Sequence, residues 1–196
     1  MMMKKQTIKL AALATVLLSG SVFAQQDAAL NVTGAVSTVA CDVSLNGVGA
    51  TLPLGTWVPG RFTNATTDVG ERDFTVSLQN CEGALLKGHG VDLSVIGAQG
   101  AFSQDQDLWG GVAPTNVGIY LKALFADKTG TAAYNEVTAA NNIVSLYTNE
   151  GDDAADAKTI ALPAVPFRIG LRMASGSTTA TTGAVAEQFT FRAVYN

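Results

Sequence analysis

The sequence contains one histidine, His89, and imidazole is the side chain most often used as a general acid or base near neutral pH. It lies between two glycines, Gly88 and Gly90, in a segment with the composition of a turn. A Ser–His–Asp arrangement stays open on composition alone, but no GxSxG segment marks a nucleophile. We therefore predict a loop histidine and a protein that is not an enzyme, with a secreted enzyme as the remaining alternative.

Three acidic residues, Asp152, Asp153 and Asp156, are the second group whose chemistry must be considered, as a calcium site. An EF-hand loop needs a central glycine and a terminal glutamate at fixed positions, and this segment lacks them. No phosphate-binding glycine loop occurs elsewhere in the sequence. The pattern predicts a solvent-exposed acidic loop, no metal site and no cofactor.

The two cysteines, Cys41 and Cys81, have no CxxC spacing, and one histidine cannot complete a zinc site with two thiols. In an exported chain a single pair predicts one structural disulfide. Closing a loop of about 40 residues stabilises a fold by about 4 kcal/mol.

The first 24 residues have the pattern of a secretory signal peptide. Three lysines precede an apolar run from Leu10 to Leu18, and cleavage is expected after Ala24. The apolar run is too short for the alternative, a membrane anchor. Without this leader the chain loses three of its 12 basic residues and keeps all 16 acidic ones, for a net charge of −7. That balance argues against nucleic acid or an anionic membrane as a partner.

The rest of the chain predicts a single all-β domain, because short runs with a two-residue apolar period are separated by turn residues. Leu108 and Trp109 lie in a loop-like stretch and are expected to pack against the body. Short strands at this spacing are typical of an immunoglobulin-like sandwich. The predicted strands are Val43–Leu45, Thr51–Leu54, Asp73–Asn80, Val91–Ile96, Val117–Phe125, Ile143–Tyr147, Thr159–Leu162, Phe167–Met173 and a final strand within Gly183–Asn196.

Two strand-like segments near the ends of the chain are unusual. In the last fourteen residues Phe189, Phe191, Ala193 and Tyr195 alternate with polar or smaller residues, and nothing after Asn196 supplies a neighbouring strand. A bare apolar edge is an aggregation hazard, so we expect another segment to cover it. Before Cys41, one face of an extended segment carries three apolar residues and a glycine, namely Leu30, Val32, Gly34 and Val36.

Together these features resemble the subunits of bacterial chaperone–usher fimbriae, the type 1-like pilins, over the whole chain after the leader. In that family an extension with one interrupting glycine precedes the first cysteine, and the two cysteines bridge the first two strands. The family also has a mid-domain stretch similar to Thr115–Gly118. Its last strand has a penultimate tyrosine and a glycine fourteen residues from the end, which are the positions of Tyr195 and Gly183.

The resemblance implies an incomplete immunoglobulin-like sandwich that lacks its final strand and is completed in trans by a donor strand. Residues 1–24 would be the signal peptide, 25–37 the donor-strand extension and 38–196 the pilin domain. A periplasmic chaperone would lend a strand and hold the Asn196 carboxylate, and at an outer-membrane usher the Leu30–Val36 segment of the next subunit would replace it. The accepting residues would be Gly183, Phe189, Phe191, Ala193, Tyr195 and Asn196.

The implied function is therefore a structural subunit that is exported through the periplasm and polymerises into a surface fimbria used in adhesion. Its partners would be the chaperone, the usher, neighbouring pilin subunits and, through the fibre, a host receptor. An alternative is a single-domain fimbrial adhesin that binds a host glycan or protein. Three aromatic residues expected in loops would stack on a sugar in that case: Trp57, Trp109 and Tyr134.

Overall fold

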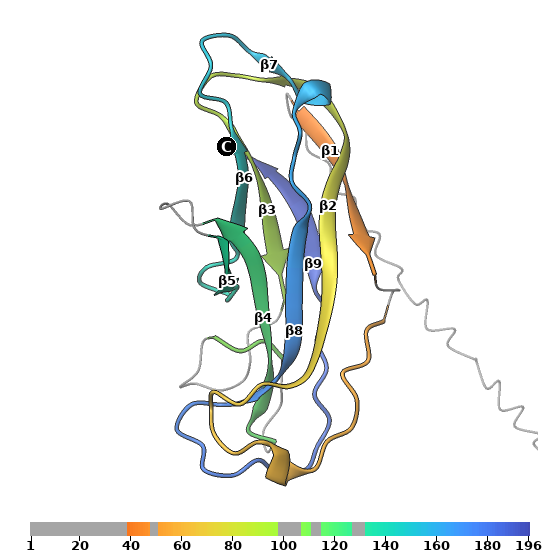
Figure 1. Ribbon diagram of the computed structural model, residues 1–196, viewed down its shortest axis with the longest axis vertical. Coiled ribbons are helices and arrows are strands. Elements are labelled where there is room, and N and C mark those ends of the chain that lie inside the picture. Colours follow the sequence, from red (N-terminus) through yellow and green to blue (C-terminus); the bar gives the residue numbers. More distant parts are fainter. Residues whose placement is uncertain (1–38, 48–50, 98–106, 111–114, 127–131) are drawn as a thin grey trace, which may run out of the picture. The chain divides into compact units, whose positions relative to one another are not determined.

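The computed structural model describes residues 39–47, 51–97, 107–110, 115–126 and 132–196, and within these it shows two antiparallel sheets (Figure 1). The larger sheet has the order β1-β2-β8-β4-β5, with β7 paired to one end of β2, and the smaller sheet has the order β6-β3-β9. The all-β prediction is thus confirmed. The strands are β1 (Val39–Asn46), β2 (Val69–Leu85), β3 (Gly90–Ile96), β4 (Val117–Ala126), β5 (Ala132–Glu136), β6 (Ile143–Thr148), β7 (Ala155–Asp156), β8 (Val165–Met173) and β9 (Thr190–Tyr195).

β8 is the central strand of the larger sheet, between β2 and β4. Its alternate residues Val165, Phe167, Ile169, Leu171 and Met173 are all buried. On the other sheet Val91, Leu93 and Val95 of β3 are almost fully buried and belong to the same apolar cluster. One core therefore lies between the two sheets, as the two-residue period predicted.

β2 is longer than predicted because two bulges let it bend and continue. One lies at Gly70 and Glu71 opposite β8, where Gly70 has a φ of +71°. The other lies near Asn80 opposite β1, where Asn80 has a φ of 50°. Left-handed residues at such positions increase the local twist and redirect the strand. The second bulge sits beside the Cys41–Cys81 disulfide, which joins β1 to β2 and confirms the predicted bridge.

The outer face of the larger sheet carries an ion network. Arg172 of β8 donates to Asp68 and Glu136 at 2.7 and 2.6 Å, and Lys122 of β4 donates to Asp68 at 2.9 Å. Burial opposes the charge on Asp68, but hydrogen bonds from Arg172 and Lys122 hold its pKa below the ordinary 3.8. Both cations also lie over the ring of Tyr120. The positive charges of Arg172 and Lys122 on this face are therefore paired with carboxylates.

Two predictions about strands were wrong. Thr51–Leu54 pairs with no strand in the described part of the chain, and Thr159–Leu162 begins at the end of a 3-10 turn, η2 (Ala157–Thr159), without forming a strand. The final strand, Thr190–Tyr195, lies within the predicted range Gly183–Asn196. β5 and the two-residue β7 were missed because neither has a clear apolar alternation. A second 3-10 turn, η1 (Pro59–Arg61), precedes β2. Within the described residues no helix is long and apolar enough to span a membrane.

Candidate strand-accepting groove

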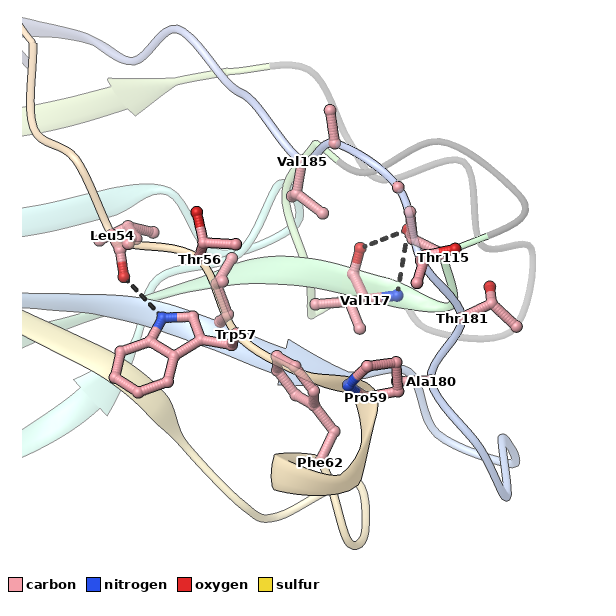
Figure 2. A pocket seen from close by; sticks show the side chains of 15 residues that line it. Leu54, Thr56, Trp57, Pro59, Phe62, Thr115, Val117, Ala180, Thr181 and Val185 are labelled. Atoms are coloured by element: carbon pink, nitrogen blue, oxygen red, sulfur yellow. Dashed lines mark hydrogen bonds between the residues drawn. The ribbon is translucent and has the colours of Figure 1, made fainter.

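Two adjoining hollows of about 490 and 530 Å³ open along one side of the domain. Leu54 and Val185 line both of them, so the two hollows form one groove. One wall is the segment 51–59, which ends at the first residue of η1, and the other is the segment 180–191, which includes the first two residues of β9. Figure 2 shows the 530 Å³ hollow, with Leu54 and Phe62 facing Thr115 and Val185 across it. We call the first segment the N-wall and the second the C-wall.

The floor of the groove is the edge of the apolar core. Phe74 of β2, Ile119 of β4 and Ile169 of β8 line the 490 Å³ hollow. Phe62, Val117 and Leu171 line the other. All six residues belong to the core cluster and are between 4% and 9% exposed. An occupant of the groove would therefore contact the core directly.

Aromatic rings join the C-wall to this floor. The ring of Phe191 lies edge-on to Phe74 and Phe167, with centroids 5.8 and 5.3 Å apart. Phe189 makes the same kind of contact with Trp109 at 5.5 Å. Such pairs are favourable beyond their buried area. Even so, Phe189 and Phe191 are only half-buried, because the groove runs along their open side.

Neither wall is completed by a strand on its groove side. β9 pairs with β3 along Thr190–Tyr195, and no other strand in the described ranges pairs with it. No backbone–backbone hydrogen bond joins residues 51–57 to any other described residue. Extended backbone whose amides and carbonyls lack ladder partners is a ready template for another strand.

Tyr195, near the end of β9, ties this strand to β1. Its hydroxyl accepts a hydrogen bond of 2.6 Å from the Cys41 backbone N–H, beside the disulfide. Burial raises the pKa of this hydroxyl above its ordinary 10.0, although the bond from Cys41 lowers it. The hydroxyl is therefore neutral at physiological pH.

The next residue, Asn196, fastens the end of β9 to β3. Its side-chain oxygen accepts from the Gly90 N–H at 2.7 Å, and its amide donates to Asp92 at 2.9 Å. His89 Nδ1 lies 2.5 Å from the Asn196 carbonyl oxygen. The histidine lies in the β2–β3 turn, as predicted, and it contacts the strand end.

At one end of the groove the C-wall passes close to Thr115. A Cβ placed on Gly183 would lie 2.3 Å from the Thr115 side-chain methyl carbon, so only glycine fits without a shift. Thr115 is itself buried, and its hydroxyl bonds to both backbone groups of Val117. This contact is a physical reason for the glycine that the sequence singled out.

The sequence-predicted residues are placed in two groups. Phe189, Phe191, Ala193 and Tyr195 lie along the C-wall and the rest of β9, and all four pack against the core. Leu30, Val32, Gly34 and Val36, together with residues 1–24, lie outside the described residues.

Among the residues that the structure describes, no three acidic, histidine or cysteine side chains are grouped to hold a metal ion. Asp152 and Asp153 are exposed, as predicted for the acidic loop.

The three aromatics proposed for sugar stacking are not brought together. Trp109 is buried, and its indole N–H donates to the Val137 carbonyl at 2.7 Å. This agrees with the prediction that Trp109 packs against the body of the domain. Tyr134 lies in β5 beneath Arg168 and not in a loop. Trp57 alone is exposed. The prediction that Trp109 and Tyr134 form an open stacking surface in loops was therefore wrong: Trp109 packs into the core, and Tyr134 lies in a strand with its ring under Arg168.

Sequence reasoning missed the N-wall as part of the site. Thr51–Leu54 has the alternation of a strand, since Leu52 and Leu54 are half-buried between exposed neighbours. The available signal was that this segment contains Pro53, is followed by Gly55 and Pro59, and has no obvious partner.

Comparisons with known proteins show a likeness to solved structures. No protein-family model and no curated protein matches the sequence. Among solved structures, the chain is similar to the P pilus rod subunit PapA, with a TM-score of 0.47 and 16% identity over 86% of this chain and 100% of that one.

Proposed function

We propose that this protein is a structural subunit of a chaperone–usher fimbria that polymerises by accepting a strand from a neighbouring subunit. The observation that carries the proposal is the groove, whose floor is core and whose walls have no ladder on the groove side. An inserted strand would pair with β9, cover Phe189 and Phe191, and complete the smaller sheet. Addition of a strand to an exposed edge is a general mode of peptide recognition.

The segment Leu30–Val36 has the composition that such a groove needs. Alternate residues of a strand lie about 6.6–6.8 Å apart on one face, so Leu30, Val32 and Val36 would reach successive parts of the floor. Each buried side chain of this kind contributes about 1.5–3 kcal/mol at most. Gly34 would lie where the groove is shallow and a side chain would clash.

The partners follow from the same chemistry. An exposed apolar groove makes the free subunit prone to aggregate, so a chaperone strand would occupy it during export through the periplasm. At the outer-membrane usher the extension of the next subunit would displace that strand. The fibre would then stand on the cell surface, where it would mediate adhesion, including contact with a host receptor.

The proposal is tested by deleting residues 25–36. Cells that produce this variant are expected to form no fibres, while the variant still folds in its chaperone complex. Fibres are measured by electron microscopy of sheared material. Normal fibre yield from the deletion would overturn the proposal.

A point variant separates the groove contact from the mere presence of the extension. Gly34→Leu is expected to block polymerisation, and Asn31→Ala, which changes the opposite face of the segment, is the matched control and is expected to polymerise. Equal fibre yields from these two variants would contradict the proposed role of Gly34.

A further inference from the structure

The N-wall is held in place in an unusual way. It runs alongside the core without a ladder, and its apolar residues Leu52 and Leu54 are only half-buried. A segment fixed so weakly would not keep a constant distance from the C-wall. An inserted strand needs that distance, because it must lie about 4.7–4.9 Å from each neighbour.

Trp57 supplies a specific attachment. Its indole N–H donates to the Leu54 carbonyl at 2.7 Å, across three residues of its own segment. Figure 2 shows the ring turned toward Leu54 and away from Thr115 and Val117 on the far side of the hollow. Although the side chain is 38% exposed, it is therefore not free on the surface.

The ring rests on the first bulge of β2. A Cβ on Gly70 would lie 2.7 Å from the indole nitrogen and 2.6 Å from the Leu54 carbonyl oxygen. The positive φ of Gly70, at the bulge opposite β8, creates the space that the indole and this carbonyl occupy. The indole–carbonyl pair therefore lies against the bulge of β2, at the edge of the hollow that Leu54 and Trp57 both line.

We propose that Trp57 is a positioning residue of the groove, which fixes the N-wall against the β2 bulge so that the groove-side backbone of residues 51–57 is presented to an incoming strand. The inference rests on the proposed function, and it names the residue that holds one wall of the groove in position. The attachment engages the Leu54 carbonyl, and it leaves the other backbone amides and carbonyls of residues 51–57 without backbone partners among the described residues.

The experiment measures binding of a synthetic peptide with the sequence of residues 27–37 to the purified chain and to its variants. Trp57→Phe keeps a ring and removes the N–H donor, so peptide binding is expected to weaken about three- to tenfold. Trp57→Ala removes both and is expected to weaken it more. Val58→Ala is the matched control, since Val58 is the adjacent residue and its side chain is 67% exposed.

To distinguish positioning of the groove from a general effect on stability, the unfolding midpoint of each variant is measured without peptide. Peptide binding is then compared under conditions in which every variant is folded. Gly70→Ala perturbs the same wall in a second way, because the added Cβ would displace the indole of Trp57. The effects of Gly70→Ala and Trp57→Phe on peptide affinity are then expected to be non-additive.

The outcomes separate the two claims. Binding to the wild-type chain that is weakened by Trp57→Phe and unchanged by Val58→Ala supports the inference. Equal affinity of the wild-type chain and both Trp57 variants overturns the inference and leaves the proposed function intact. Absence of peptide binding to the folded wild-type chain overturns the proposed function itself.

Discussion

β8 and β9 have the same alternation of apolar and polar residues but differ in their burial. Phe167, in the middle of β8, is fully buried, whereas Phe191 of β9 is half-buried, although both rings contact Phe74 and each other. β8 has β2 on one side and β4 on the other, and β9 has only β3 among the described strands. The difference shows that a strand can have the sequence of an interior strand while one of its edges remains unfinished.

The largest expected effect comes from truncating the two phenylalanines. Phe167→Ala is expected to lower the free energy of unfolding by about 3–5 kcal/mol, because it leaves a cavity in a filled core. Phe191→Ala is expected to cost less in the free chain. Its cost is expected to rise when the 27–37 peptide is bound, since the groove then covers the ring. Denaturant titrations with and without peptide measure both values.

Equal losses of unfolding free energy for Phe167→Ala and Phe191→Ala in the free chain would contradict the difference between β8 and β9. A loss for Phe191→Ala that the peptide leaves unchanged would also contradict it, because the open side of β9 would then not be the side that binds the peptide.

A smaller effect is expected at the Thr115 end of the groove. Gly183→Ala places a methyl group 2.3 Å from the Thr115 methyl carbon, and overpacking of this kind costs about 1–3 kcal/mol. Thr115→Ser removes the opposing methyl and keeps the hydroxyl that bonds to Val117. The double variant is therefore expected to recover most of the loss in thermal unfolding experiments. A double variant no more stable than Gly183→Ala would show that the contact with Thr115 is not the reason for the glycine.

The smallest effect is expected on the completed face of the larger sheet. Since the folded pKa of Asp68 lies below its ordinary 3.8, its pairing stabilises the fold above that pH and is lost as the pH falls below it. The stability difference between the wild-type chain and Asp68→Asn is expected to shrink on acidification. The exposed Asp73, paired with Arg168, is the matched control and is expected to contribute less.

Adding the peptide is expected to leave this acid dependence unchanged, because the network lies on the outer face, away from the groove. A change in the pH dependence of stability on adding peptide would show that the outer face and the groove are coupled, and it would contradict their independence.

Much of the fold could be predicted from the sequence. The two-residue period at Phe167–Met173 and Val91–Ile96 identified buried strands, and the cysteine pair identified the link between β1 and β2. The sequence also singled out Phe189, Phe191, Ala193 and Tyr195 as one wall of the site. Periodicity reports which face is apolar, so it succeeds wherever one face packs on the core.

The rest depended on contacts between distant segments. Only Pro53 and the following Gly55 argue locally against Thr51–Leu54 as a paired strand, because its alternation is real and its partner is missing. The inward position of Trp109 depends on the carbonyl of Val137, and the position of Trp57 depends on a bulge that follows it by thirteen residues. Such partners are set by tertiary packing, which overrides local propensity.

The central claim is that this domain has an unfinished edge that takes up a strand from another molecule. Amide hydrogen exchange of the purified chain, with and without the 27–37 peptide, tests it most directly at residues 51–57 and 190–195. We predict fast exchange in the free chain for the amides of both walls that face the groove, and marked protection of both when the peptide is bound. Protection of both walls already in the free chain, with no change on adding peptide, would contradict the account.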